Sequence, residues 1–277
     1  PPFDETITDV NVPFINAPGH FRLHLHLVEL LPLLSEGAAI GGERLPEIMA
    51  KDSKLSMQEL IGNADELLTR IEKKMLHLGG PSKASLSLAL VPLIYWYNRK
   101  GIFVRALMYG WVHWLLSGID SEIQERKIAV SSVRGELEES LIRYKDEFAD
   151  IQHRGGAGLK SLAAITSFSQ KLVETLLLTR GDAPSDRDAK ISAIFGAKAE
   201  PGQRQSVASR AFSKSKQAEI NVRELLGSSL LCDICGGVID LKQGVQYDHK
   251  EEHSIGGLTV PENGRPTHPF CNLFRER

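Results

Sequence analysis

All three cysteines of this 277-residue chain lie in its last 46 residues, and their spacing constrains the fold more than any other feature. Cys232 and Cys235 form a C-x-x-C pair, and His268 with Cys271 repeats that spacing 33 positions later. Three thiolates and one imidazole can complete a tetrahedral site. An odd cysteine count in this arrangement does not fit a secreted disulfide framework. The pattern therefore predicts a structural zinc ion in an intracellular, cytoplasmic protein; the alternative is that the cysteines are incidental.

The composition is that of an ordinary folded protein. Hydrophobic residues make up 42% and charged residues 25%, with a formal net charge of −2, which excludes wholesale disorder, a collagen-like fibre and a whole-chain polycation. The longest apolar run, 86–97, contains Ser87 and Pro92 and is shorter than the roughly 20 residues of a membrane helix. The length suggests about two domains, and we expect no membrane partner.

Residues 53–180 have helical periodicity. Apolar residues recur every three or four positions from Met57 to Leu78, after a capping box at Ser56 and Glu59. Further helices are predicted over about 83–98, with a kink at Pro92, and over 102–116, 133–153 and 160–179. We predict a mainly helical chain with a bundle of five or six helices.

Aromatic residues gather in two neighbouring helices of this predicted bundle. A base-stacking platform is conceivable, but large aromatic side chains more often build cores, and we favour core packing. The cluster comprises Tyr95, Trp96, Tyr97, Phe103, Tyr109, Trp111 and Trp114.

The first 50 residues are rich in proline and glycine, with one short helix expected near 21–34. His20 and His24 there have a spacing that can hold a metal, but no carboxylate or cysteine beside them completes a site. Because residue 1 is Pro, the chain is expected to be part of a longer or processed protein with a further domain upstream.

Residues 181–223 are predicted to be a linker containing one or two short helices. Its second half is basic: from Pro201 to Arg223 there are five basic residues and one acid. Such a run is either a solvated helix face or a DNA-backbone contact. The candidate DNA-contact residues are Arg204, Arg210, Lys214 and Lys216.

Between the two halves of the zinc pattern lies a second constellation. Asp248 and His249 are adjacent, Asn263 follows His249 by 14 positions, and Asn272 follows it by 23. A histidine can accept a proton near neutral pH, and Asp and Asn oxygens suit a hard divalent cation. These residue types are those that phosphodiester hydrolysis requires.

Residues 231–275 resemble an HNH endonuclease, the ββα-metal nuclease family. The resemblance rests on the Asp-His pair, the following Gly256-Gly257, the asparagine 14 positions after the histidine, and the bracketing zinc pairs. Glu252 stands where many members have proline, and His268 where cysteine is commoner. The resemblance implies that a small α+β domain follows the helical bundle: a strand-loop-strand-helix module of the H-N-N version.

The resemblance also implies roles. His249 would be the general base, Asp248 and Asn272 would hold a catalytic Mg²⁺ or Mn²⁺, and Asn263 would fix the loop that orients His249. Cys232, Cys235, His268 and Cys271 would hold zinc.

A second resemblance involves the helical part. Segment 88–110 resembles the helical region downstream of ParB-like nucleotide-sensing domains in bacterial defence nucleases, although the Asp-Gly-Gln-Gln-Arg motif of those domains is absent. We therefore expect a helical regulatory or target-recognition domain (1–180), a basic linker (181–223) and an HNH nuclease domain (224–277).

The expected function is metal-dependent DNA cleavage in restriction or anti-phage defence. One site nicks one strand, and a homodimer would be needed for double-strand cutting. Two alternatives stay open: an inactive zinc-stabilised DNA-binding module, and a helical partner-binding regulatory protein.

Overall fold

The computed structural model describes Leu78 and residues 87–154, 159–196, 214–240 and 245–274. This part of the chain is mainly helical and contains a two-stranded antiparallel sheet, as predicted. The longer helices are α6 (Arg105–Leu116), α7 (Asp120–Ser132), α8 (Arg134–Arg143), α9 (Lys145–Arg154), α10 (Leu159–Leu178), α11 (Pro184–Phe195) and α12 (Lys214–Gly227). The shorter elements are α5 (Pro92–Tyr95), β1 (Gln246–His249), η1 (His253–Ile255), η2 (Pro261–Asn263), β2 (Gly264–Thr267) and α13 (Pro269–Phe274).

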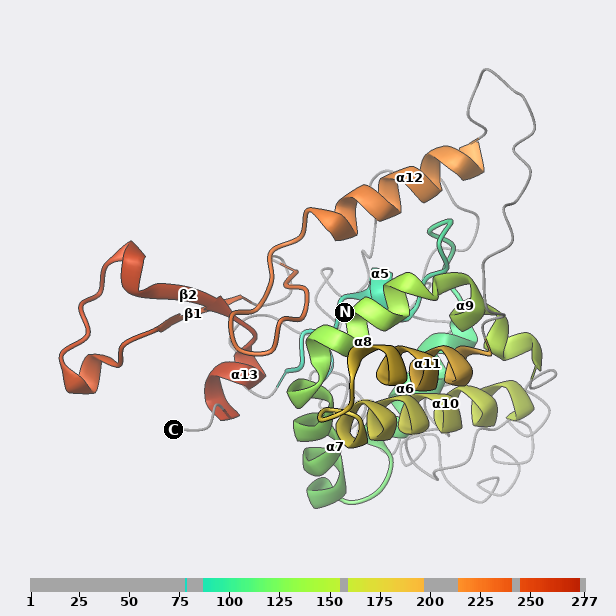
Figure 1. Ribbon diagram of the computed structural model, residues 1–277, viewed down its shortest axis with the longest axis horizontal. Coiled ribbons are helices and arrows are strands. Elements are labelled where there is room, and N and C mark those ends of the chain that lie inside the picture. The colour runs from blue at the N-terminus through green and yellow to red at the C-terminus, as the bar shows by residue number, and fades with distance from the viewer. Residues whose placement is uncertain (1–77, 79–86, 155–158, 197–213, 241–244, 275–277) are drawn as a thin grey trace, which may run out of the picture.

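Helices α6, α8, α9 and α11 all pack against α10, and with it they form what is here named the helical body (Figure 1). The most extensive contact of α10 is with α6, and the two helices approach closely at Gly110. A Cβ atom there would lie 2.3 Å from Ile165 Cγ2, so only glycine fits this crossing without movement. The apolar periodicity that predicted helices 102–116 and 160–179 is the buried face of this pair.

The aromatic cluster belongs to the core, as predicted. Tyr95, Trp96, Tyr97, Trp111 and Trp114 are all buried. Ring edges meet ring faces between Tyr95 and Trp111, whose centroids are 5.1 Å apart, and again between Trp111 and Trp114. Burial of these rings excludes them as an open stacking surface for bases.

The prediction of a helix over 83–98 is wrong in the part that the structure describes. Residues 87–91 are non-helical, and α5 is a single turn with Pro92 at its first position, where the missing N–H is not needed. Ala89 has a φ of 47°, and the Ser87 hydroxyl accepts a hydrogen bond from its N–H. The apolar run is thus a buried segment without regular structure up to Val91, followed by one helical turn, rather than a kinked helix.

The predicted helix over 133–153 is two helices, α8 and α9, with a break at Tyr144. The Tyr144 ring stacks on Phe195 of α11, with centroids 4.7 Å apart. Ile191 and Phe195 of α11 are buried in the main core. Helix α11 comes from the segment expected to be linker, so the helical body extends beyond residue 180, at least to Phe195.

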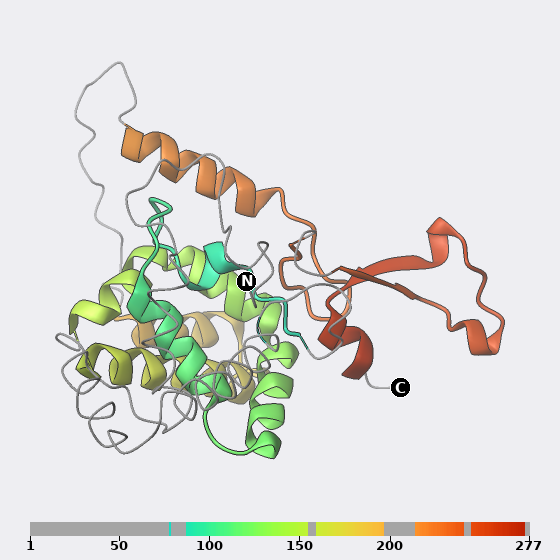
Figure 2. The same cartoon turned by 180° about the vertical axis from the view of Figure 1, so that it is seen from behind.

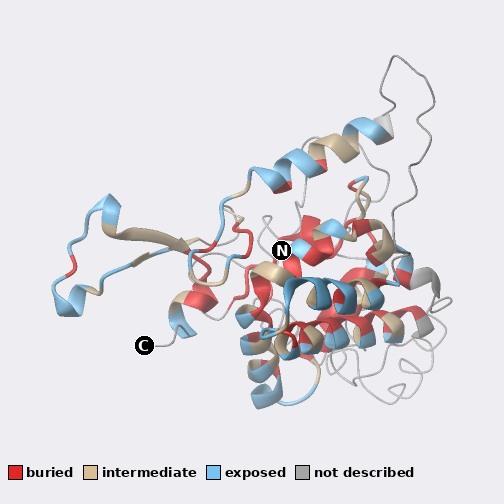
Figure 3. Cartoon of the chain, in the orientation of Figure 1, coloured by how far each residue is buried: buried red, intermediate tan, exposed pale blue. Residues whose placement is uncertain are grey.

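Strands β1 and β2 form an antiparallel ribbon in which Asp248 pairs with Arg265 and His249 with Gly264. The ribbon and its connecting loop project from the helical body in both views (Figures 1 and 2). Much of the projecting loop is exposed and the strands are mostly of intermediate burial, whereas residues 267–271, after β2, are buried (Figure 3). The ribbon therefore contacts the helical body at one end, and the loop at its other end is exposed to solvent.

Several predictions lie outside the described residues: the helix after the capping box up to residue 77, the N-terminal histidines, and Arg204 with Arg210. Within the described parts of the chain, no helix combines the length and apolar character needed to cross a membrane.

Candidate metal centre

The four predicted zinc ligands come together in space. Cys232, Cys235, His268 and Cys271 place their ligand atoms within 4.8 Å of one another, with Cys232, His268 and Cys271 buried. His268 Nδ1 lies 3.4 Å from Cys235 Sγ and 3.8 Å from Cys271 Sγ. Ligand atoms about 2.0–2.3 Å from one tetrahedral ion have separations of this size. The cluster fits a structural zinc ion.

Two local features orient the ligands. Cys232 and Cys235 lie on a tight turn in which Gly236 N–H donates to Cys232 C=O, and Gly236 has a φ of +70°, a conformation that favours glycine. His268 Nε2 lies 3.0 Å from the Val238 carbonyl oxygen, which directs Nδ1 toward the thiols. A backbone carbonyl behind a ligating histidine is the usual outer-shell arrangement of a metal site.

The thiols also interact with one another. Hydrogen bonds from Cys235 and Cys271 hold the pKa of Cys232 well below its usual range. Donating these bonds to Cys232 raises the pKa of Cys235 to about 11 and that of Cys271 well above its ordinary value. Cys232 is thus a thiolate that accepts hydrogen bonds from two thiols. A bound cation would take the place of these two thiol protons.

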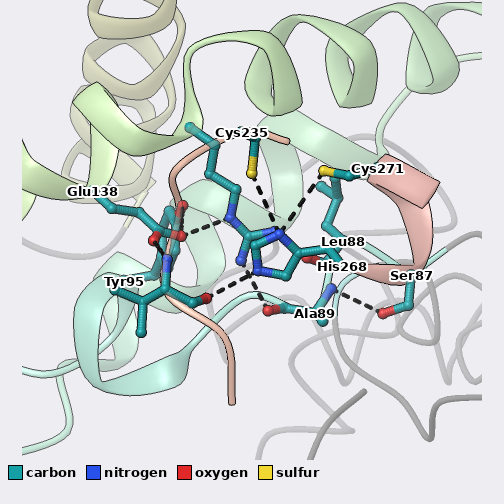
Figure 4. Close-up of polar contacts among 10 residues, drawn as sticks. Ser87, Leu88, Ala89, Tyr95, Glu138, Cys235, His268 and Cys271 are labelled. Carbon is teal, nitrogen blue, oxygen red and sulfur yellow. Dashed lines mark hydrogen bonds and ion pairs between the residues drawn. The ribbon is translucent and has the colours of Figure 1, made fainter. Parts of the chain in front are cut away.

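The turn that carries Cys232 and Cys235, here named the zinc turn, packs on the start of α8. Gly135 N–H donates to Cys235 C=O at 2.9 Å, and Val238 N–H donates to Glu138 Oε2 at 2.5 Å. Figure 4 shows Cys235 and Cys271 directed toward His268, with Glu138 and Tyr95 beside them. The metal centre and the helical body therefore share one interface, which contains a buried carboxylate.

A buried ion pair completes this interface. Arg134 Nε donates to Glu138 Oε1 at 2.7 Å, and Tyr95 O–H donates to the same oxygen at 2.9 Å. The other Arg134 nitrogens donate to the carbonyls of Leu88 and Ala89. Burial lowers the pKa of Arg134, but attraction to Glu138 outweighs this effect, and the pKa lies above its ordinary value. The guanidinium thus stays charged where water does not reach.

Asp248 and Asn272 lie on the same side of β1. Alternation along the strand puts Gln246 and Asp248 on one face, and Asn272 of α13 donates from Nδ2 to Gln246 Oε1 at 2.8 Å. That bond leaves the Oδ1 oxygen of Asn272 for another partner. The Asp248 carboxylate accepts two hydrogen bonds from Arg265. The oxygens of Asp248 and Asn272 are hard donors that suit Mg²⁺ or Mn²⁺.

His249 is the last residue of β1 and contacts the loop. Its Nε2 lies 3.0 Å from Thr259 Oγ1, and its ring centroid is 6.1 Å from that of His253. Asn263 ties this loop together: Oδ1 accepts from Glu251 N–H, while Nδ2 donates to the carbonyls of Glu251 and Leu258. Asn263 thus holds both sides of the loop that follows His249.

The DNA-contact candidates are only partly described. Lys214 begins α12, and Lys216 is exposed on the same helix, with its Nζ 3.9 Å from Glu219 Oε2. Sequence reasoning missed Arg134, Glu138 and Arg265, although Arg134 and Glu138 support the zinc turn and Arg265 pairs with Asp248. A charged residue in an apolar helix face was the signal for Arg134; no sequence signal singled out Arg265.

No known protein family, curated protein or solved structure matches this chain.

Proposed function

We propose that this protein is a metal-dependent endonuclease that hydrolyses DNA phosphodiester bonds through an HNH-type module. The supporting observation is the order of strand, loop, strand and helix over residues 246–274. In that order, Asp248 and His249 end the first strand, Asn263 fixes the loop, and Asn272 lies on the helix next to the first strand. The Cys₃His ligands flank this module in the sequence, and the turn that carries Cys232 and Cys235 contacts α8.

In this mechanism, His249 takes the proton from the attacking water. The Thr259 hydroxyl holds the imidazole at Nε2, so Nδ1 is the basic nitrogen when Thr259 accepts from Nε2–H. Asn263 keeps the loop closed with three hydrogen bonds, which prevents Thr259 from drifting away from the ring. An oriented base contributes typically 10²–10⁴-fold to the rate.

Asp248 and Asn272 would hold the catalytic cation. When bound, Mg²⁺ or Mn²⁺ supplies charge neutralisation at the scissile phosphate and stabilises the leaving oxygen. Asn272 contributes a neutral oxygen, so the site would carry one negative charge and leave a bound cation strongly electrophilic. One module contains one such constellation, and the elementary product is a nick; double-strand cleavage would take two copies.

The basic stretch 201–223, which includes most of helix α12, is the proposed DNA-backbone contact. Lys214 and Lys216 lie on α12, and Arg204 and Arg210 precede this helix in the sequence. A cationic stretch attracts phosphates without reading base sequence. The helical body would then aim or restrain the nuclease, in keeping with a role in restriction or anti-phage defence.

A second candidate is a zinc-stabilised DNA-binding module that does not cut. The observation that favours it is the ion pair between Asp248 and Arg265, since a carboxylate engaged by arginine is less available to a cation.

Plasmid nicking distinguishes the two candidates. We expect the zinc-loaded wild type to nick supercoiled plasmid with Mg²⁺ or Mn²⁺, and His249→Ala to lose at least about 100-fold in rate. His253→Ala is the matched control, because it removes a second imidazole from the same loop and should retain nicking. Equal zinc content in all three proteins excludes misfolding. If the wild type binds plasmid but none of the proteins nicks it, the binding module is the correct function.

A further inference from the structure

Arg265 forms the closest ionic contact within the proposed nuclease site. It lies directly opposite Asp248 in the β1–β2 register, and its Nε and Nη2 are 3.1 and 3.0 Å from Asp248 Oδ2. The Asp248 side chain is 10% exposed and that of Arg265 is 20% exposed. Because water is largely excluded, this pair is held more firmly than an exposed surface pair.

A second carboxylate faces the same guanidinium. Asp233 Oδ2 is 3.7 Å from Arg265 Nη1, and Asp233 lies in the zinc turn between Cys232 and Cys235. The Asp233 N–H donates to the Pro266 carbonyl, which attaches the zinc turn to β2. Arg265 therefore lies between the structural metal centre and Asp248, held by an acid on each side.

This arrangement opposes binding of a divalent cation at Asp248. The cation would carry two positive charges next to the single charge of Arg265, and it would compete for the same carboxylate. Repulsion between these charges at a few ångströms weakens binding by about tenfold or more, even when it is well screened.

A DNA phosphate offers the guanidinium another partner. Arginine binds phosphate through two parallel hydrogen bonds, in the same way as it binds carboxylate. Arg265 is also among the residues that line a hollow of about 460 Å³ bordered by the zinc turn, α7 and α13. A phosphodiester that approaches Arg265 from this hollow would compete with Asp248 for the guanidinium.

We propose that Arg265 is a positioning residue that keeps Asp248 in an ion pair until a phosphodiester binds the guanidinium, so that the catalytic cation binds together with DNA. This inference rests on the proposed function, because it assigns Asp248 to a divalent cation. It explains how an ion pair can occupy the site of a working nuclease.

The test is Mn²⁺ binding, measured by electron paramagnetic resonance on the zinc-loaded full chain carrying His249→Ala, so that DNA stays intact. With Arg265 present, we expect weak binding that tightens about tenfold or more when a mixed-sequence duplex is added. Arg265→Gln should bind Mn²⁺ tightly without DNA and respond little to it. Arg265→Lys keeps the charge and should still bind weakly without DNA. Duplex alone corrects for Mn²⁺ on the DNA.

Asp248→Asn separates failure of this inference from failure of the proposed function. If Mn²⁺ binding depends on Asp248 but is equally strong in the proteins with and without Arg265→Gln, the proposed role of Arg265 is refuted and the cation site stands. If no variant shows binding that depends on Asp248, the proposed role of Arg265 and the proposed catalytic cation site both fail. Zinc content and circular dichroism must match across the variants.

Discussion

Replacing Glu138 with glutamine should destabilise the protein far more than the same change at the next residue. Glu138 accepts hydrogen bonds from Arg134, Tyr95 and the Val238 N–H, and the side chains of Arg134 and Glu138 are 0% and 2% exposed. Glutamine removes the charge that compensates Arg134. Breaking a buried pair by neutralising one partner costs about 3–5 kcal/mol.

Glu139→Gln is the matched control. Glu139 also pairs with an arginine in α8 with i,i+4 spacing, Arg143, but these side chains are 67% and 48% exposed. Loss of such a helix-surface pair costs only about 0.3–0.5 kcal/mol. The free energy of unfolding would be measured by urea titration of both zinc-loaded variants. A similar small loss in both would refute the reasoning that a buried ion pair holds the zinc turn on α8.

Three further perturbations test the packing and the metal centre. Gly237→Ala should lower the melting temperature, because its Cβ would lie 2.7 Å from the Cγ of the buried Arg134; Gly181→Ala, with no atom within 4 Å, should have little effect, and equal melting temperatures would contradict this. Burial lowers the pKa of Lys145 to about 7, so the unfolded chain binds more protons than the folded chain between about pH 7 and 10.5. The stability of wild type relative to Lys145→Met should therefore rise with pH across that window, and urea titrations showing no such rise would overturn the burial argument. Chelation of zinc should lower the melting temperature, and His268→Ala should reduce the zinc content from about one equivalent; full zinc retention in that variant would refute the ligand assignment.

The zinc ligands were predictable because their signal is local. Two residues separated by two positions reach one ion from a single turn, whatever the rest of the chain does, and Cys232 and Cys235 lie on such a turn. The 3–4 residue periodicity of α6 and α10 is local in the same sense, and it correctly predicted both helices, which pack together.

Local signals failed where long-range contacts decided the conformation. The apolar run around Pro92 predicted a helix, yet residues 87–91 are not helical. The buried guanidinium of Arg134 donates hydrogen bonds to the carbonyls of Leu88 and Ala89, 46 and 45 positions away. The local apolar pattern does not encode this compensation of a buried charge by distant carbonyls. Helix α11 lies in the segment predicted to be a linker with one or two short helices. Its packing could not be predicted locally, because Phe195 contacts Tyr144 and Phe168 from other helices.

The sequence by itself determined the residue types of the metal centre, the helical character of the chain and the order of Asp248, His249, Asn263 and Asn272. The tertiary structure alone decided that the zinc turn docks on α8 through Glu138, 100 positions from its partner Val238, and that Arg265 faces Asp248. The physical reason is that a metal turn or a helix face is built from neighbours along the chain. A buried charge, in contrast, is stabilised only by the particular groups that folding brings around it.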